Sequence, residues 1–225
     1  MNVLILEANG QIARIVEERI LTESAFEDVK LTLGLRNPSR LQNLAGNSRV
    51  TLSEVDLNRR DQVEAVIEGQ DIVFVAAVDH DKQNRPTKNV IAAMKTTGVK
   101  RVLYTNILGL YNEVPVEFGR WNLAQVRSSL NAAITSDRLL ADSDVDYTTF
   151  RLPWLNNRDE IKYEVTHKDE TYVGVSGSRK SIADLILQII SDPTLYSKDS
   201  IGIADAATQG LNRPILINLG IVKQK

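Results

Sequence analysis

A short apolar segment at the start of the chain leads through a turn of small residues directly into an amphipathic helix. Residues 2–6 read Asn-Val-Leu-Ile-Leu, and residues 7–13 read Glu-Ala-Asn-Gly-Gln-Ile-Ala. A helix is predicted over Gln11–Leu21 because its apolar residues share one face, at Ile12, Ile15, Val16 and Ile20. Such a turn gathers backbone N–H groups at the helix N-terminus, where the helix dipole adds partial positive charge. The opening residues therefore predict a buried parallel strand followed by a phosphate-binding turn.

The turn departs from the glycine pattern that such phosphate sites use. A G-x-x-G-x-x-G loop would place glycines at positions 7, 10 and 13, and this chain has Glu7, Gly10 and Ala13. Ala13 adds only a methyl group, whereas Glu7 adds a carboxylate beside the expected pyrophosphate. A unit charge about 5–6 Å from a phosphate costs roughly 3 kcal/mol at an effective dielectric constant of about 20, or about two powers of ten in affinity. We expect Glu7 to weaken dinucleotide binding unless Arg14 neutralises it or its side chain turns away.

Strand-like and helix-like segments alternate after this unit. Further strands are predicted at Val29–Leu35, Val50–Glu54, Asp71–Val75, Arg101–Thr105 and Asp146–Leu152. Helices are predicted at Asp61–Glu68, Thr87–Thr97, Ala124–Leu140 and Ile182–Ile190, with a short helix starting at Pro38 and capped by Asn37. The strands are nearly continuous in apolar residues, as expected for strands covered on both faces. The pattern predicts an α/β fold with one doubly wound, mostly parallel sheet of the Rossmann type, flanked by helices.

The last third of the chain changes character but shows no linker rich in Gly or Pro. Short strands are predicted at Tyr172–Val175 and Ile215–Ile217. We expect a single domain over residues 1–225, in which residues 153–225 form a small C-terminal cap.

The end of the second strand carries a group of anion-binding side chains. Arg36, Ser39 and Arg40 lie where a Rossmann domain selects its cofactor, and a basic residue there accommodates the 2′-phosphate of NADP. We therefore expect NADP(H) to be preferred over NAD(H). The alternative is that both arginines simply solvate a loop.

Two further positions border the expected cofactor cleft at the carboxyl ends of the strands. Asp56 and Leu57 follow the third strand, where Asp56 can accept a hydrogen bond from an adenine amino group. Ala76 and Ala77 end the fourth strand and leave room for a ribose, although plain strand packing explains them equally well.

The composition excludes several other classes of protein. The 225 residues are 43% apolar and 25% charged, with a net charge of −2 and no basic block that suggests a nucleic-acid partner. The absence of cysteine excludes disulfides, a thiolate metal site and a cysteine nucleophile. His80 and His167 are read as solvated loop histidines, so no metal is expected. A core strand rather than a leader opens the sequence, and no apolar stretch is long enough for a membrane span. We expect a cytoplasmic protein without a membrane partner.

Several segments, taken in order, resemble a known family. They are A-N-G-Q-I-A, L-R-N-P-S-R-L, V-D-L, F-V-A-A, G-V-K-R-V-L-Y-T-N and D-Y-T-T-F-R-L-P-W-L. This order resembles the atypical short-chain dehydrogenase/reductase group, whose relatives include NmrA-like and biliverdin reductase B-like NAD(P)H-binding proteins. The resemblance covers the chain from about Asn2 to Ile217.

The resemblance implies which positions meet the two ends of the cofactor. Residues at the end of the fifth strand, Thr105 and Asn106, and the R-x-P segment with Leu152 and Pro153 are expected beside the nicotinamide. The turn residues expected at the pyrophosphate are Ala8, Asn9, Gly10, Gln11 and Ile12.

The catalytic dyad of typical short-chain dehydrogenases is missing. Those enzymes use Tyr-x-x-x-Lys, in which the ammonium lowers the pKa of the phenol for general-acid work. Here the aligned positions are Phe118 and Asn122, and Tyr111 has no lysine four residues further on. Trp121 and Trp154, with Tyr111 and Phe118, either form an aromatic platform for a flat acceptor or are ordinary core residues.

Three functions remain open from the sequence. The first is hydride transfer from NADPH to an unidentified small organic acceptor without the dyad. Biliverdin reductase B-like relatives imply this mode, in which solvent supplies the proton. The second is an NmrA-like regulatory protein that senses the dinucleotide without turning it over. The third is a degenerate scaffold that has lost the cofactor because of Glu7. The catalytic residues and the oligomeric state cannot be read from the sequence.

Overall fold

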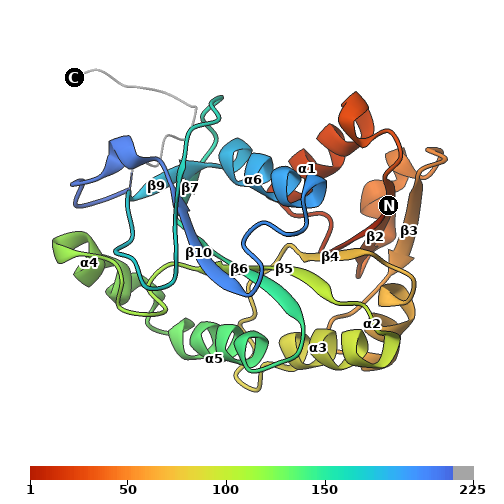
Figure 1. Ribbon diagram of the computed structural model, residues 1–225, viewed down its shortest axis with the longest axis horizontal. Helices are drawn as coiled ribbons and strands as arrows, with labels where there is room; N and C mark the ends of the chain where they lie inside the picture. The colour runs from red at the N-terminus through yellow and green to blue at the C-terminus, as the bar shows by residue number, and fades with distance from the viewer. Residues whose placement is uncertain (215–225) are drawn as a thin grey trace.

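The core of the protein is one eight-stranded sheet with the order β3-β2-β1-β4-β5-β6-β10-β8 (Figure 1). The computed structural model describes residues 1–214, so the strand expected at Ile215–Ile217 lies outside the described residues. The strands of this sheet are β1 (Asn2–Leu6), β2 (Lys30–Leu35), β3 (Val50–Glu54), β4 (Ile72–Val75), β5 (Arg101–Ile107), β6 (Asp146–Leu152), β8 (Glu164–Thr166) and β10 (Asp199–Ala204). All neighbouring pairs are parallel except β10 with β8.

Helices cover both faces of this sheet. On one face α1 (Gln11–Thr22) packs against α6 (Arg179–Ser191), and on the other α2 (Arg60–Ile67), α3 (Arg85–Thr97) and α5 (Leu130–Ala141) lie side by side (Figure 1). Each face has its own buried apolar cluster, because successive strand residues point to opposite sides. The remaining elements are α4 (Val116–Val126), β7 (Trp154–Asn156), β9 (Ser176–Ser178), and the short helices η1 (Ser24–Phe26), η2 (Pro38–Leu44) and η3 (Ala206–Thr208). The predicted doubly wound α/β fold is confirmed.

The strand order changes direction between β1 and β4, which creates the ligand crevice of such a sheet. From β1 the chain runs outward to β2 and β3, then returns to β4 on the other side of β1. In doubly wound sheets ligands bind outside the carboxyl ends of the strands at this switch point. The turn at residues 7–10 and the segment after Val75 meet there, joined by the hydrogen bond from the Ala76 amide to the Leu6 carbonyl (2.9 Å).

The single long helix predicted over Ala124–Leu140 is wrong. The structure has two helices, α4 ending at Val126 and α5 beginning at Leu130. Ser129 explains the break, because both its amide (2.9 Å) and its hydroxyl (3.1 Å) donate to the Val126 carbonyl. A serine side chain that competes for a backbone carbonyl in this way favours a turn over a continuous helix.

The strand predicted at Tyr172–Val175 is also wrong, since β9 begins only at Ser176. Gly174 has a φ of 90°, and its amide donates to the side-chain oxygen of Gln209. The Val175 amide donates to the Thr208 hydroxyl, while the Val175 carbonyl accepts from the Trp154 amide (3.2 Å), so this backbone bonds to several separate segments and forms no regular ladder. Tyr172 is fully buried, which explains why an irregular segment is apolar.

Strand β10 was not predicted, although it lies inside the sheet. Its sequence, Asp-Ser-Ile-Gly-Ile-Ala, alternates apolar and small residues too weakly to indicate a central strand. Gly202 is small for a packing reason: a Cβ there would come within 2.6 Å of the Tyr172 ring and 2.5 Å of the Thr166 hydroxyl. Within residues 1–214 no helix has the length and apolar character that a membrane crossing requires.

Candidate functional site

The turn after β1 leaves an uncapped helix N-terminus at the crevice. The Ala8 amide donates to the Gly34 carbonyl (3.2 Å) and the Gly10 amide to the Glu7 carbonyl (3.1 Å), which closes the turn. Gly10 is the N-cap of α1, and no side chain caps it. The N–H groups of Gln11 and Ile12 therefore have no intrahelical acceptor, and they are available to an anion with the positive end of the helix dipole behind them.

Glu7 has a backbone conformation that favours glycine. Its φ is 57°, in the left-handed region, which costs a residue with a Cβ roughly 1–2 kcal/mol. Gly10, in contrast, has a φ of −66°, and a Cβ there would meet its neighbours only at 3.5 Å or more. Position 7 is therefore the position of the turn whose backbone conformation favours glycine, and this chain has a glutamate there.

A hollow of about 420 Å³ lies beside this turn at the carboxyl ends of β1, β2, β3 and β4. Its lining includes five residues that the sequence analysis singled out. They are Glu7, Arg36, Asp56, Leu57 and Ala77. The other lining residues are Asn58, Val78–Asp81, Pro86 and Tyr104, so segments that are far apart in the sequence form one concave surface.

Asp56 is held as a carboxylate at the rim of the hollow. Its Oδ1 accepts hydrogen bonds from the amide (2.9 Å) and the side chain (3.1 Å) of Asn58. The bond from the Asn58 amide is the main reason that the pKa of Asp56 lies below its usual value, and the positive charge of Arg36 acts in the same direction. Arg36 itself is exposed and makes no hydrogen bond within residues 1–214, so its guanidinium is available to a ligand.

The rest of the predicted anion group does not line this hollow. Asn37 caps η2, accepting from the Ser39 amide at 3.2 Å as expected for an N-cap, and it also bonds the Ser39 hydroxyl. Arg40 is exposed on the same short helix. In the turn and the start of α1, Ala8 is buried, Asn9 and Gln11 are exposed, and Ile12 is half-buried. Ala76, directly after β4, is also half-buried.

The residues expected at the nicotinamide end also lie outside this hollow. Thr105, Asn106, Leu152 and Pro153 are all buried at the ends of the neighbouring strands β5 and β6. The Asn106 side chain is occupied locally, because its Nδ2 donates to the Ala133 carbonyl (2.9 Å) and its Oδ1 accepts from the Ile107 amide (2.9 Å).

Three of the four aromatic residues proposed as a platform form one cluster. The Phe118 and Trp121 rings stack with centroids 6.0 Å apart, and Trp121 lies 4.8 Å from Trp154. Asn122, at the position of the missing lysine, is buried and accepts the Trp154 indole N–H at 3.0 Å. Tyr111 is not part of the cluster, since its hydroxyl bonds to Asp137.

A buried polar network behind the hollow was not predicted. The Thr87 hydroxyl lies 2.6 Å from a carboxylate oxygen of Asp79, 3.0 Å from the Tyr104 hydroxyl and 2.7 Å from the Ser136 hydroxyl. Burial raises the pKa of Tyr104, so the phenol stays protonated. The segment Asp79-His80-Asp81 after β4 was the signal for this network in the sequence. His80 was considered in the sequence analysis, but Asp79 is the residue that bonds to Thr87.

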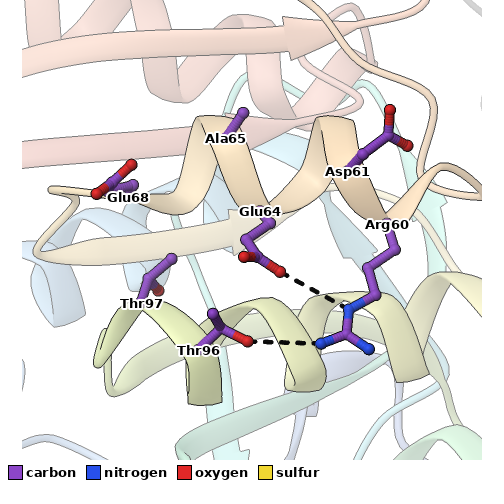
Figure 2. Close-up of a pocket in the computed structure, with 7 residues that line it drawn as sticks. All are labelled: Arg60, Asp61, Glu64, Ala65, Glu68, Thr96 and Thr97. Atoms are coloured by element: carbon purple, nitrogen blue, oxygen red, sulfur yellow. Dashed lines mark hydrogen bonds and ion pairs between the residues drawn. The ribbon is translucent and has the colours of Figure 1, made fainter.

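A hollow of about 580 Å³ between α2 and α3 lies elsewhere on the surface (Figure 2). Arg60 spans it, with Nε 3.7 Å from a Glu64 carboxylate oxygen and an N–H directed at the Thr96 hydroxyl (3.5 Å) (Figure 2). Glu68 and Thr97 line its other end at the C-termini of the two helices, away from the carboxyl edge of the sheet where ligands bind. Within residues 1–214 no group of three or more His, Asp or Glu side chains is placed to hold a metal ion.

Comparison with known protein families shows to which family the chain belongs. The profile of a family described as NAD(P)H-binding matches residues 8–193. The chain belongs to this NAD(P)H-binding family. The match begins one residue after Glu7 and includes the other residues that line the hollow, and it confirms the resemblance to the atypical short-chain dehydrogenase/reductase group.

Known proteins of this kind are similar over most of the chain. A short-chain dehydrogenase/reductase from Veillonella parvula DSM 2008, solved in complex with NADP, is 25% identical with a TM-score of 0.87, covering 96% of this chain and 99% of that one. A Rossmann-fold NAD(P)-binding family protein from Shigella flexneri is 30% identical with a TM-score of 0.73, covering 96% and 98%. Quinone oxidoreductase 2 from Escherichia coli K12 is 25% identical over 180 residues, which are 79% of this chain and 57% of that protein. The chain thus spans little more than half the length of this curated relative.

The start of α1 and Arg36 offer groups that suit the dinucleotide that the family binds, and Glu7 is the residue that departs from glycine in the turn. The free N–H groups at the start of α1 suit a pyrophosphate, and the unbonded Arg36 guanidinium suits a phosphate group attached to the ribose. Glu7 is one of the residues that line the same hollow, and its side chain makes no hydrogen bond or ion pair to any group in residues 1–214. Arg14, the expected neutralising partner, is instead paired with Glu17 at 2.8 Å.

Proposed function

We propose that this chain is an NADPH-dependent oxidoreductase that reduces a small organic acceptor. The observation that carries the proposal is the pair of anion sites on one crevice: the uncapped N-terminus of α1 and the Arg36 guanidinium, which lines the hollow. The two sites match the pyrophosphate and the 2′-phosphate of NADPH, and Arg36 favours NADPH over NADH.

We assign the contacts with the cofactor from the position of each residue in the fold and from the family resemblance. The amides of the turn residues 8–12 hold the pyrophosphate, Asp56 and Leu57 meet the adenosine, and Ala76 and Ala77 leave room for a ribose. Thr105, Asn106, Leu152 and Pro153 surround the nicotinamide end. Ser39 and Arg40 extend the positive region around Arg36.

Bound NADPH supplies a hydride, and the chain supplies position. Phe118 and Asn122 offer no acidic proton, and the buried Tyr104 phenol, with its raised pKa, keeps its proton. The proton for the product therefore comes from solvent, and catalysis rests on holding a flat acceptor against the cofactor. The Trp121–Trp154 pair is the aromatic surface that we assign to this purpose. A quinone is the acceptor class to test first, because a quinone oxidoreductase is among the relatives.

A second candidate is dinucleotide sensing without turnover. The observation that favours it is the packing of the former dyad positions: Phe118 belongs to an apolar cluster, and Asn122 is fixed by the Trp154 indole. A protein with this function acts through the conformation that bound NADPH stabilises, and it forms no product.

Cofactor titration separates these functions. NADPH and NADH are titrated into the purified protein and followed by cofactor fluorescence and thermal shift, and NADPH oxidation is then measured with a series of quinones. Selective NADPH binding with quinone-dependent oxidation supports the oxidoreductase. Selective binding without oxidation of NADPH by any acceptor supports sensing. An absence of binding at millimolar concentration contradicts both functions.

A further inference from the structure

One wall of the hollow is a loop that contacts outside it must hold in shape. The wall follows β4 and consists of residues 77–81, which all line the hollow. Residues 76–84 belong to no helix or strand, so no regular backbone ladder fixes them. Tyr104 of β5 and Pro86, in the first turn of α3, line the hollow beside this loop.

Asp79 attaches the loop to the start of α3. Its side chain is 3% exposed, and its Oδ2 accepts both the amide (3.1 Å) and the hydroxyl (2.6 Å) of Thr87. Its Oδ1 accepts the Asp81 amide at 2.9 Å, which closes the loop on itself. Thr87 is the third residue of α3, so its amide is one of the N–H groups that a helix leaves free. Asp79 thus caps α3 from the loop, because the N-cap residue Asn84 makes no capping bond with its own side chain.

Helix α5 holds the same contact from the other side. The Thr87 hydroxyl lies 2.7 Å from the Ser136 hydroxyl on α5, and it accepts the Tyr104 hydroxyl at 3.0 Å. Since Thr87 donates its one hydroxyl hydrogen to Asp79, the Ser136 hydroxyl is the donor in the bond between them. The Asn84 side chain also reaches α5, where it donates to the Ala132 carbonyl at 2.8 Å. One buried hydroxyl, that of Thr87, therefore joins the loop after β4 to β5 and α5.

We propose that Thr87 and Ser136 are positioning residues of the candidate cofactor site, whose hydroxyls fix the loop after β4 in the shape that binds the dinucleotide. Both are fully buried, so neither touches the ligand. The inference rests on the proposed NADPH site and adds to it the groups that shape it. Without the Thr87 hydroxyl, Asp79 loses its shortest hydrogen bond, and the cofactor has to order the loop when it binds, which lowers its affinity.

The test is a calorimetric titration of NADPH into the wild-type protein and matched variants. Thr87→Val keeps the shape of the side chain and removes the hydroxyl, and a hydrogen bond to a carboxylate changes an equilibrium constant by about tenfold or more. We therefore expect Thr87→Val to weaken NADPH binding by about tenfold and Ser136→Ala, which leaves the bond to Asp79 in place, by about threefold. Thr87→Ser restores the hydroxyl and should bind within about twofold of wild type.

Thr149→Val is the control for the loss of a buried threonine hydroxyl. Thr149 is fully buried in β6, and its hydroxyl has no hydrogen-bond partner within residues 1–214. This variant should bind NADPH within about twofold of wild type. If Thr87→Val does not fold, Ser136→Ala and Thr149→Val make the same comparison.

Hydrogen exchange gives a second measurement, made without cofactor. The Asp81 amide should exchange about tenfold faster in Thr87→Val than in wild type, because its acceptor Asp79 is less firmly held. The amides of β1, which report on global unfolding, should change by less. Equal acceleration at Asp81 and in β1 would show a general loss of stability and would overturn the inference.

The outcomes separate this inference from the proposed function. If wild-type protein does not bind NADPH, the proposed function fails and the inference fails with it. If wild type binds NADPH and both Thr87→Val and Ser136→Ala bind it as tightly, only the inference is overturned. A loss in Thr149→Val equal to that in Thr87→Val also overturns it, because any buried hydroxyl would then have the same effect.

Discussion

The guanidinium of Arg151 donates a hydrogen bond to the Glu113 carboxylate at 2.8 Å, and both side chains are buried, with 0% and 4% of their surface exposed. The same carboxylate accepts the amides of Gly109 and Tyr111, each at 2.9 Å. Arg151 also donates to the carbonyls of Ser200 and His167. The pair therefore ties the loop that follows β5 to β6, β10 and the segment after β8, and it shapes the region expected around the nicotinamide.

Neutralising this carboxylate should destabilise the protein strongly. In Glu113→Gln the buried Arg151 charge loses its partner, and breaking a buried pair from one side costs about 3–5 kcal/mol. We expect a loss of this size in urea unfolding. Glu117→Gln, an exposed glutamate on α4, is the control and should change the free energy of unfolding by less than about 0.5 kcal/mol. Equal small effects of the two substitutions would show that Glu113 is not the tie between these segments.

The same pair predicts an acid limit to stability. Burial alone would raise the pKa of Glu113, but the hydrogen bonds from Arg151 and from the loop amides outweigh it, so the pKa lies below its usual 4.5. A carboxyl whose pKa is lower in the folded state stabilises the protein above the unfolded-state pKa. This contribution is lost as the pH falls from about 4.5 through the folded-state pKa. Unfolding measured from pH 6 down to pH 3 should show this loss in wild type and a smaller one in Glu113→Gln.

The sequence predicted the first strands of the sheet better than it predicted β10, for a physical reason. Strands β1 and β4 are buried on both faces and are therefore nearly continuous in apolar residues, which makes them recognisable in the sequence. Strand β10 carries Gly202 because Tyr172 and Thr166 approach it closely, and such packing has no local signal in the sequence. At the site, the strand ends located Arg36, Asp56 and Ala77, since position in the unit determines them. The left-handed backbone of Glu7 and the network around Asp79 depend on contacts between distant segments, which the sequence does not state.

Glu17 should make stability fall as the pH rises through neutrality. Its side chain is 1% exposed, and burial raises its pKa from 4.5 to about 8, while the ion pair with Arg14 offsets only part of the effect. A carboxyl with a raised folded-state pKa stabilises the protein below pH 4.5, and this contribution is lost between pH 4.5 and about 8. Glu17→Gln should therefore be more stable than wild type at pH 9, by a few kcal/mol at most, and similar to it at pH 5. Glu18→Gln controls for the change in net charge. A constant difference between Glu17→Gln and wild type at both pH values would contradict the raised pKa.

Arg36 should control the choice between the two nicotinamide cofactors. A phosphate held by a guanidinium contributes about 1.5–3 kcal/mol, so Arg36→Ala should weaken NADPH binding by about tenfold to a hundredfold and NADH binding by less than threefold. Arg127→Ala is the matched control, because Arg127 is exposed and does not line the hollow. The comparison is made in the Glu7→Gln background as well, where we expect tighter binding to make both constants measurable. Equal losses for NADPH and NADH would rule out the 2′-phosphate assignment.

Asn122 should act as a structural partner of Trp154 in place of the absent catalytic lysine. Its Oδ1 accepts the Trp154 indole N–H at 3.0 Å, and its Nδ2 donates to the Leu108 carbonyl at 3.4 Å. In Asn122→Ala the indole N–H loses its partner in a partly buried setting, which costs about 1–3 kcal/mol. The change should also shift the tryptophan emission, because Trp154 packs against Trp121 at 4.8 Å. Asn131→Ala, at an exposed position on α5, should leave both the stability and the emission unchanged. If Asn122→Ala abolished quinone reduction while stability and emission stayed at wild-type values, Asn122 would have a role in the chemistry that its buried contacts do not indicate.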